Sequence, residues 1–235
     1  MALPKLETPK YTCVLPSSKK TVEFRPFLVG EQKVLLIAQE ADDANQQIRE
    51  MIRMIDTCCD DIKAESLSAV DLEYLFLQIR IKSVGETSEV IIACSDCKKD
   101  NTVTIDLEST EVLREGKEVS NIVKITPNIS LDLQYPNYKV IQQLDANKTD
   151  DTKQVFEVVA KCINAVIDGD EIHTKDDFED KELQSFLDSM SMDMFEKVQE
   201  FFSSAPSLVI NHSYDCQECN TNNTLKLQGI GSFFG

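Results

Sequence analysis

Basic residues are scarce in this sequence, and this limits the partners that it is suited to bind. The 235 residues include 24 Lys and Arg against 41 Asp and Glu, which gives a formal net charge of −17. Nucleic-acid binding needs clustered basic side chains that displace counterions, and a chain of this charge repels the polyanion. We therefore expect no nucleic-acid partner. The charge favours solubility or steering toward a basic protein.

Catalytic patterns are also lacking. Neither of the two histidines, His173 and His212, has a nucleophile or acid partner at a recognisable spacing. No glycine-rich phosphate loop is present. Residues 168–173 look partly like a calcium loop but depart from the EF-hand pattern, so they predict a turn. His212 lies near Cys216 and offers an alternative metal ligand, although an ordinary strand residue is the simpler interpretation. We expect no enzyme activity.

Long apolar segments are absent. No run reaches the roughly 18 residues that a membrane span needs. Residues 1–5 carry no apolar signal core, so we expect neither stable membrane insertion nor secretion. Without a secretory signal, the eight cysteines are expected to be thiols or metal ligands rather than a disulfide framework.

Hydrophobic residues still make up 42% of the chain, which is enough for a folded core. Short alternating segments predict strand pairs over residues 10–27 and 121–134. Apolar residues at helical spacing predict helices over 45–59, 70–82 and 155–166. We therefore predict an α+β fold in which a helical domain is built on a small β base.

Two Cys-x-x-Cys motifs lie in an internal repeat. When the sequence is aligned with itself at a shift of 122 residues, four residues match identical ones: Cys94, Cys97, Asn101 and Thr102 align with Cys216, Cys219, Asn223 and Thr224. Each motif lies between two predicted strands with the same apolar alternation. Two such hairpins bury little surface alone, but they are stable when paired around a metal ion. The repeat predicts two β-hairpin knuckles that form a zinc ribbon.

Four cysteines in two such turns predict one structural zinc ion, ligated by Cys94, Cys97, Cys216 and Cys219. The protein fills all four positions, so no site is open for a catalytic water. Redox-active dithiols and unliganded thiols are the alternatives, and redox dithiols usually lie at a helix N-terminus. The remaining cysteines are expected to be small core residues: Cys13, Cys58, Cys59 and Cys162.

The residue after each second cysteine is unusual for a zinc knuckle. Glycine is common at this position because the backbone there has a positive φ, but this chain has Lys98 and Asn220. Asparagine tolerates that conformation better than lysine does. We therefore expect the knuckle around Cys94 to be the looser of the two.

Three segments are expected to build one compact unit. Residues 1–106 supply the N-terminal strand pair, helices and the first knuckle. Residues 107–206 supply inserted strands and a helical region. Residues 207–235 supply the second knuckle and an aromatic tail.

Several segments occur in a recognisable order with the two cysteine motifs: Phe24–Leu36, Leu72–Glu86, Val166–Ile172 and Phe195–Phe202. Together they resemble the baseplate hub assembly proteins of T-even-type contractile-tailed phages over most of the chain. The resemblance implies a non-catalytic role in building the central hub of the tail baseplate, with other hub and tail proteins as partners. It places the chain in the host cytoplasm during assembly, either as an assembly factor or as a component of the virion tail.

Aromatic and arginine side chains are the candidate partner contacts, because such residues commonly anchor interfaces. They occur in two groups: Phe24, Arg25 and Phe27, and the terminal Phe233 and Phe234. Core packing is the other interpretation of the first group, and a frayed tail is that of the second.

Two further functions compete with the assembly role. A zinc-ribbon adaptor of a transcription complex would favour a basic ribbon face, but the knuckles carry mixed charge. A thiol-dependent enzyme would need reactive thiols that no metal blocks.

Overall fold

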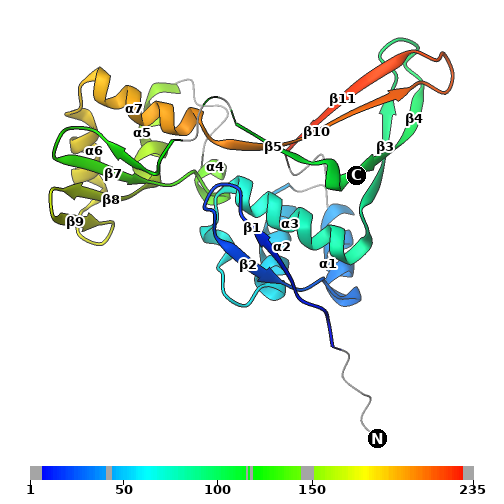
Figure 1. Cartoon of the computed structure of the whole chain (residues 1–235), viewed down its shortest axis with the longest axis horizontal. Helices are drawn as coiled ribbons and strands as arrows, with labels where there is room; N and C mark the ends of the chain where they lie inside the picture. Colours follow the sequence, from blue (N-terminus) through cyan, green and yellow to red (C-terminus); the bar gives the residue numbers. More distant parts are fainter. Residues whose placement is uncertain (1–6, 41–43, 115, 117–118, 144–150, 230–235) are drawn as a thin grey trace, which may run out of the picture. The chain divides into compact units, whose positions relative to one another are not determined.

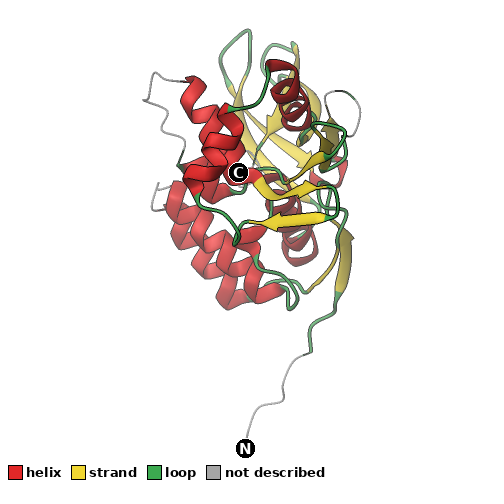
Figure 2. Cartoon of the chain, turned by 90° about the vertical axis from the view of Figure 1, so that its left-hand side faces the viewer, coloured by secondary structure: helices red, strands yellow, loops and turns green. Residues whose placement is uncertain are grey.

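The computed structural model describes residues 7–40, 44–114, 116, 119–143 and 151–229. The chain divides into two compact units (Figure 1). Unit 1 consists of Met1–Leu113 and Ser207–Gly235, and unit 2 consists of Arg114–Pro206. The described chain contains both helices and short strands (Figure 2), and both kinds of element occur in each unit, so the predicted α+β class is confirmed. Among the described residues, no helix combines the length and apolar character that crossing a membrane requires.

Three helices pack in chain order in unit 1, and α2 contacts both of its neighbours. They are α1 (Val29–Glu40), α2 (Ala44–Cys58) and α3 (Ala69–Val84), with a 3-10 turn, η1 (Ala64–Ser66), before α3. Helix α3 is the most deeply buried, because its apolar residues cover more than one face. Leu75 and Ile79 have no exposed surface. The helices predicted over 45–59 and 70–82 are thereby confirmed.

A hydrogen-bonded carboxylate joins α3 to the N-terminal hairpin, which consists of β1 (Tyr11–Val14) and β2 (Thr21–Phe24). Asp71 is 1% exposed. It accepts hydrogen bonds from the backbone N and Oγ of Ser17, at 2.7 and 2.6 Å, and from the backbone N of Ser18 at 3.1 Å. Because a buried carboxylate needs donors, these bonds fix the turn of the hairpin onto the helix.

Two longer hairpins complete unit 1. They are β3 (Thr87–Ala93) with β4 (Asp100–Asp106), and β10 (Pro206–Asp215) with β11 (Asn222–Gln228). Strand β5 (Glu111–Arg114), after the 3-10 turn η2 (Leu107–Ser109), pairs with the other edge of β10. Alternate residues of the hairpins face inward and share one apolar cluster with Leu77 and Ile81 of α3. This apolar cluster thus joins the hairpins to each other and to α3.

Unit 2 has a four-stranded antiparallel sheet in the order β6-β7-β8-β9. Its elements are β6 (Ile122–Lys124), β7 (Ile129–Leu133), α4 (Tyr138–Gln142), α5 (Asp151–Cys162), β8 (Ile163–Asp168), β9 (Glu171–Thr174), α6 (Asp180–Asp188) and α7 (Met192–Ser203). Apolar side chains of the sheet and of α5, α6 and α7 form one core cluster. Stacked rings add to it, with the centroids of Phe156 and Phe195 4.5 Å apart.

The helix predicted over residues 155–166 is wrong in its second part. Helix α5 ends at Cys162, and Ile163 begins β8 without an intervening loop. The apolar spacing fits a helix throughout, but Ile163 and Val166 pair with Leu133 and Leu131 of β7. Pairing within the sheet therefore decides the conformation over local periodicity. The turn predicted around Asp168 and Gly169 is confirmed as the β8–β9 hairpin.

Candidate metal centre

The two Cys-x-x-Cys motifs form the turns of the two long hairpins, and both turns have the same backbone hydrogen bonds. The N of Cys94 donates to the O of Lys99 at 2.8 Å, and the N of Lys98 donates to the O of Cys94 at 3.2 Å. The second hairpin repeats this pattern at positions shifted by 122 residues, with lengths of 2.9 Å for both bonds. The sequence repeat is therefore a repeat of turn geometry.

Positive φ angles occur after both second cysteines, as the sequence predicts. Lys98 has a φ of 61° and Asn220 has a φ of 54°. Each of these residues, in the left-handed conformation, donates its backbone N–H to the O of the first cysteine of its motif and so closes the turn. A lysine bears this conformation at greater cost than an asparagine does.

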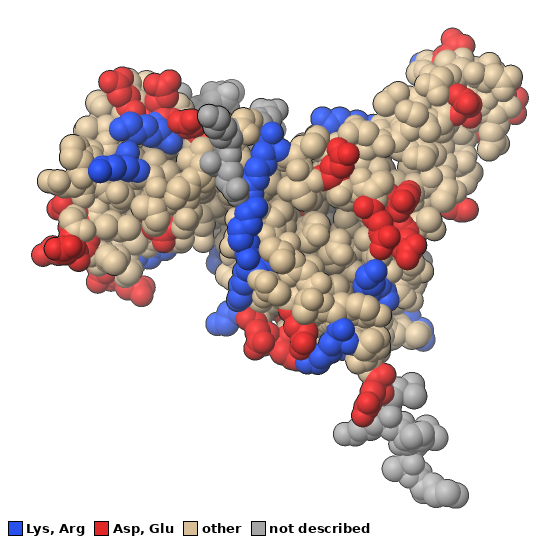
Figure 3. Space-filling model, in the orientation of Figure 1, with Lys and Arg blue, Asp and Glu red and all other residues tan. Residues whose placement is uncertain are grey.

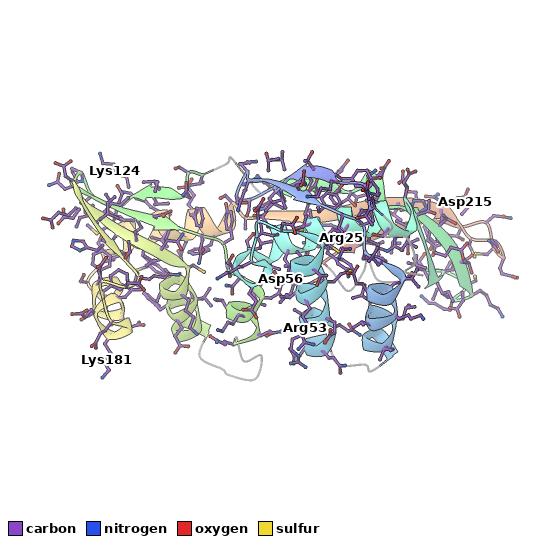
Figure 4. The ribbon with its side chains drawn as sticks, turned by 90° about the horizontal axis from the view of Figure 1, so that it is seen from below. Arg25, Arg53, Asp56, Lys124, Lys181 and Asp215 are labelled. Atoms are coloured by element: carbon purple, nitrogen blue, oxygen red, sulfur yellow. The ribbon has the colours of Figure 1, made fainter. Side chains whose placement is uncertain are left out.

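The two turns bring four sulfur atoms together. The Sγ atoms of Cys94 and Cys219 are 3.7 Å apart, and those of Cys97 and Cys216 are 3.6 Å apart. All four lie within 4.8 Å of one another. Four sulfurs about 2.3 Å from a central ion in a tetrahedron would be about 3.8 Å apart, so the donor set fits a tetrahedral metal ion. Figure 4 marks this end of unit 1 with Asp215, the residue before Cys216.

The thiol pKa values in this cluster shift in different directions, downward for Cys94 and Cys216 and upward for Cys97. Burial opposes ionisation of Cys94, but backbone N–H groups of its own turn and the amide of Asn223 outweigh it and lower the pKa to about 6. Backbone N–H groups also lower the pKa of Cys216. A backbone N–H group favours the thiolate of Cys97, but burial and the other sulfurs raise its pKa to about 12. Hydrogen bonds between the sulfurs thus favour the thiolate of some cysteines and the neutral thiol of Cys97, and a divalent cation at the centre would favour the thiolate of each.

Two asparagines link the hairpins to each other. Oδ1 of Asn223 accepts hydrogen bonds from the backbone N and Oγ of Ser95 at 2.9 and 2.7 Å. In the reciprocal direction, Oδ1 of Asn101 accepts from the backbone N of Gln217 at 3.0 Å. The repeat identifies both asparagines in the sequence, but their bonding role depends on the pairing of the two hairpins. Sequence reasoning therefore missed it.

Among the described residues, the four cysteines lie close enough together to share one metal ion. His212 does not belong to this group. Cys58, Cys59 and Cys162 are buried as predicted. Burial raises the pKa of Cys59 and of Cys162 to about 12, so both favour the neutral thiol. Cys13 is half-buried on β1.

A scan against models of protein families matches residues 8–235 to the family described as T4 bacteriophage base plate protein. The chain belongs to this family. The match includes both cysteine hairpins, and it confirms the resemblance to T-even-type baseplate proteins. Searches of curated proteins and of solved structures give no match.

In this T4-type base plate protein, the first group of candidate contacts, which consists of Phe24, Arg25 and Phe27, differs in burial. Phe24 is 2% exposed and packs with Tyr11, their ring centroids 5.9 Å apart, so core packing describes it. Arg25, which Figure 4 labels, is half-buried. It donates two hydrogen bonds to the carboxylate of Glu31, at 3.0 and 2.7 Å. Phe27 is half-buried.

The contact role of Arg25 and Phe27 stays a prediction. Phe233 and Phe234 lie outside the described residues.

The base plate protein also has an exposed apolar face that sequence reasoning missed. On α1, Leu35 points into the core, but Val29, Val34, Leu36 and Ile37 are between 47% and 71% exposed. At 100° per residue, these four side chains and Lys33 lie within an arc of about 160°. A helix that is apolar on all sides is normally covered. The many apolar residues of α1 indicate in the sequence that much of the helix needs to be covered. They do not show which side of the helix faces the core.

Proposed function

We propose that this protein is a non-catalytic structural protein of the baseplate that acts in building its central hub through protein–protein contacts. The family match over residues 8–235 carries the proposal. We propose that the protein works in the host cytoplasm during assembly and belongs to the tail proteins of the virion, and membership of the family supports the second location. The same match favours this role over that of a transcription adaptor.

One structural zinc ion held by Cys94, Cys97, Cys216 and Cys219 is part of the proposal. Thiolate ligands and tetrahedral geometry are typical of zinc or of iron–sulfur centres, and two Cys-x-x-Cys turns are a common zinc arrangement. The sulfur separations of 3.6 and 3.7 Å support a single ion. Because the protein supplies four ligands, the ion would stabilise the hairpins rather than activate water.

The exposed face of α1 supports a contact role. Exposed apolar side chains that gather on one helix face mark protein interaction sites more often than scattered ones do. We propose another baseplate protein as its partner. Nucleic acid is not proposed as a partner, because the net charge is −17. The face in Figure 3 has separate acidic groups on both units, with basic groups among them.

A complementation experiment tests the proposed function. Tail intermediates are isolated from infections in which this gene is disrupted, and they are examined by electron microscopy and mass spectrometry. We expect hubs and baseplates to be absent and to return when the wild-type chain is supplied. Normal baseplates in the disrupted infection would refute the role. Mass spectrometry of purified virions then shows whether the chain remains in the tail.

A matched pair of variants tests the contact face in the same assay. Ile37→Asp places a charge on the exposed face of α1, where Ile37 is 64% exposed. Ile172→Asp is the control, because Ile172 on β9 is 63% exposed and lies outside that face. We expect Ile37→Asp to fail in complementation and Ile172→Asp to succeed. Equal complementation by both variants would exclude the α1 face as the essential contact.

A further inference from the structure

We propose that Asn101 and Asn223 act as reciprocal positioning residues that hold the two cysteine turns in register for the metal ion. This inference rests on the proposed zinc site and extends it beyond the four ligands. The two asparagines are equivalent in the repeat, seven residues after the first cysteine of each motif. Each reaches from its own hairpin to the residue that follows the first cysteine of the other hairpin.

Each asparagine also fixes its own turn. Nδ2 of Asn101 donates to the O of Lys99 at 2.9 Å, and Nδ2 of Asn223 donates to the O of Thr221 at 2.8 Å. These carbonyls are the same ones that accept from the first cysteine of each motif. The Nδ2 of each asparagine therefore binds the carbonyl that closes its own turn, and the Oδ1 accepts from a backbone N–H of the other turn.

Both asparagines are buried. Asn101 is 2% exposed and Asn223 is 6% exposed, which is unusual for a residue type that is mostly found at the surface. Both ends of each amide have partners, as a buried polar group requires. An apolar substitution would leave the N–H of Ser95 or Gln217 without its partner, so the pairing of the hairpins depends on these amides.

The amide of Asn223 also contacts a ligand sulfur directly. Nδ2 of Asn223 lies 3.6 Å from the Sγ of Cys94, and the backbone N of Asp96 lies 3.4 Å from the same sulfur. Groups that hydrogen-bond metal ligands fix the ligand orientation, and their loss commonly weakens metal binding by roughly 10–100-fold. Because Asn223 contacts Ser95, Thr221 and Cys94, whereas Asn101 contacts Lys99 and Gln217, Asn223 should have the larger effect.

The experiment measures zinc affinity of the full chain by competition with a chromophoric chelator, and ligand geometry by the absorption spectrum of the cobalt(II) form. The variants are Asn223→Ala and Asn101→Ala. Thr224→Ala and Thr102→Ala are matched controls, because these exposed threonines follow the asparagines on the same strands. We expect zinc affinity to fall roughly 10–100-fold for Asn223→Ala and less for Asn101→Ala, with both controls unchanged.

A milder variant keeps the inference testable if Asn223→Ala does not fold. Ser95→Ala removes the 2.7 Å bond to Asn223 and leaves the backbone bond in place. We expect it to weaken zinc binding by a few-fold while the wild-type circular dichroism is retained. Rescue is expected from Ser95→Thr, which restores the hydroxyl.

The outcomes separate this inference from the zinc site itself. If the wild type binds zinc and both asparagine variants bind it with unchanged affinity and cobalt spectrum, the positioning role is overturned and the zinc site stands. If the wild type binds no zinc, the metal part of the proposed function fails, and this inference fails with it. Weaker binding with an altered cobalt spectrum in the asparagine variants alone supports the positioning role.

Discussion

The two units of this base plate protein are held together in different ways. In unit 2, one apolar cluster includes the sheet and three helices, all within a continuous stretch of chain. In unit 1, the two long hairpins share an apolar cluster with α3 that contains no residue of the cysteine turns, and their pairing joins segments more than a hundred residues apart. Their tips are joined by sulfur atoms and buried amides instead. Where little apolar surface can be buried, polar and metal-binding groups must fix the arrangement.

Removing the cysteine site should have the largest effect. We expect Cys94→Ser combined with Cys216→Ser to abolish zinc binding and to destabilise unit 1 by more than about 4 kcal/mol. Unit 2 should keep its structure, because its core contains none of these residues. Metal analysis by mass spectrometry, with urea unfolding followed by hydrogen exchange, measures both effects. Cys13→Ser is the control that should keep the metal. Equal zinc content in the double variant and the wild type would contradict the prediction.

A core substitution in unit 2 should produce the opposite pattern. Leu131 on β7 has no exposed surface and belongs to the unit 2 cluster. We expect Leu131→Ala to destabilise unit 2 by about 2–5 kcal/mol, because it leaves a cavity. Zinc stoichiometry should stay at the wild-type value. Hydrogen exchange of peptides from 119–143 and 151–203 reports the loss. A parallel loss of zinc would show that the two units do not unfold independently.

The link between Asp71 and the N-terminal hairpin should have an intermediate effect. Asp71→Ala removes the acceptor for the backbone N–H groups of Ser17 and Ser18, and it leaves them without this partner. We expect a loss of about 2–3 kcal/mol in the free energy of unfolding of unit 1. Ser17→Ala keeps the carboxylate and both backbone bonds, so it should cost about 1 kcal/mol. Equal losses for the two variants in urea unfolding would exclude a special role for the carboxylate.

The sequence predicts elements well where local pattern and tertiary contacts agree. The cysteine hairpins were predictable because residues that alternate between apolar and polar flank both Cys-x-x-Cys motifs. The end of α5 was not, because Ile163 and Val166 satisfy a helical spacing and pair in a sheet equally well. The exposed face of α1 was not predictable either. An apolar helix face needs to be covered, but the sequence does not show whether the same chain or another protein covers it.

The two cysteine turns offer the smallest and most specific test, because they have the same backbone but a different residue at positive φ. Lys98→Gly should stabilise unit 1 by about 1 kcal/mol, since glycine adopts a φ of 61° without the strain of a Cβ atom. Asn220→Gly should change the stability by only a few tenths of a kcal/mol, because asparagine already tolerates this conformation. Lys98→Ala is the control, since it removes the hydrogen bond from Nζ to the O of Ser95 but keeps the Cβ atom. If Lys98→Gly is no more stable than Lys98→Ala in urea unfolding, strain at this position does not make the Cys94 turn the looser one.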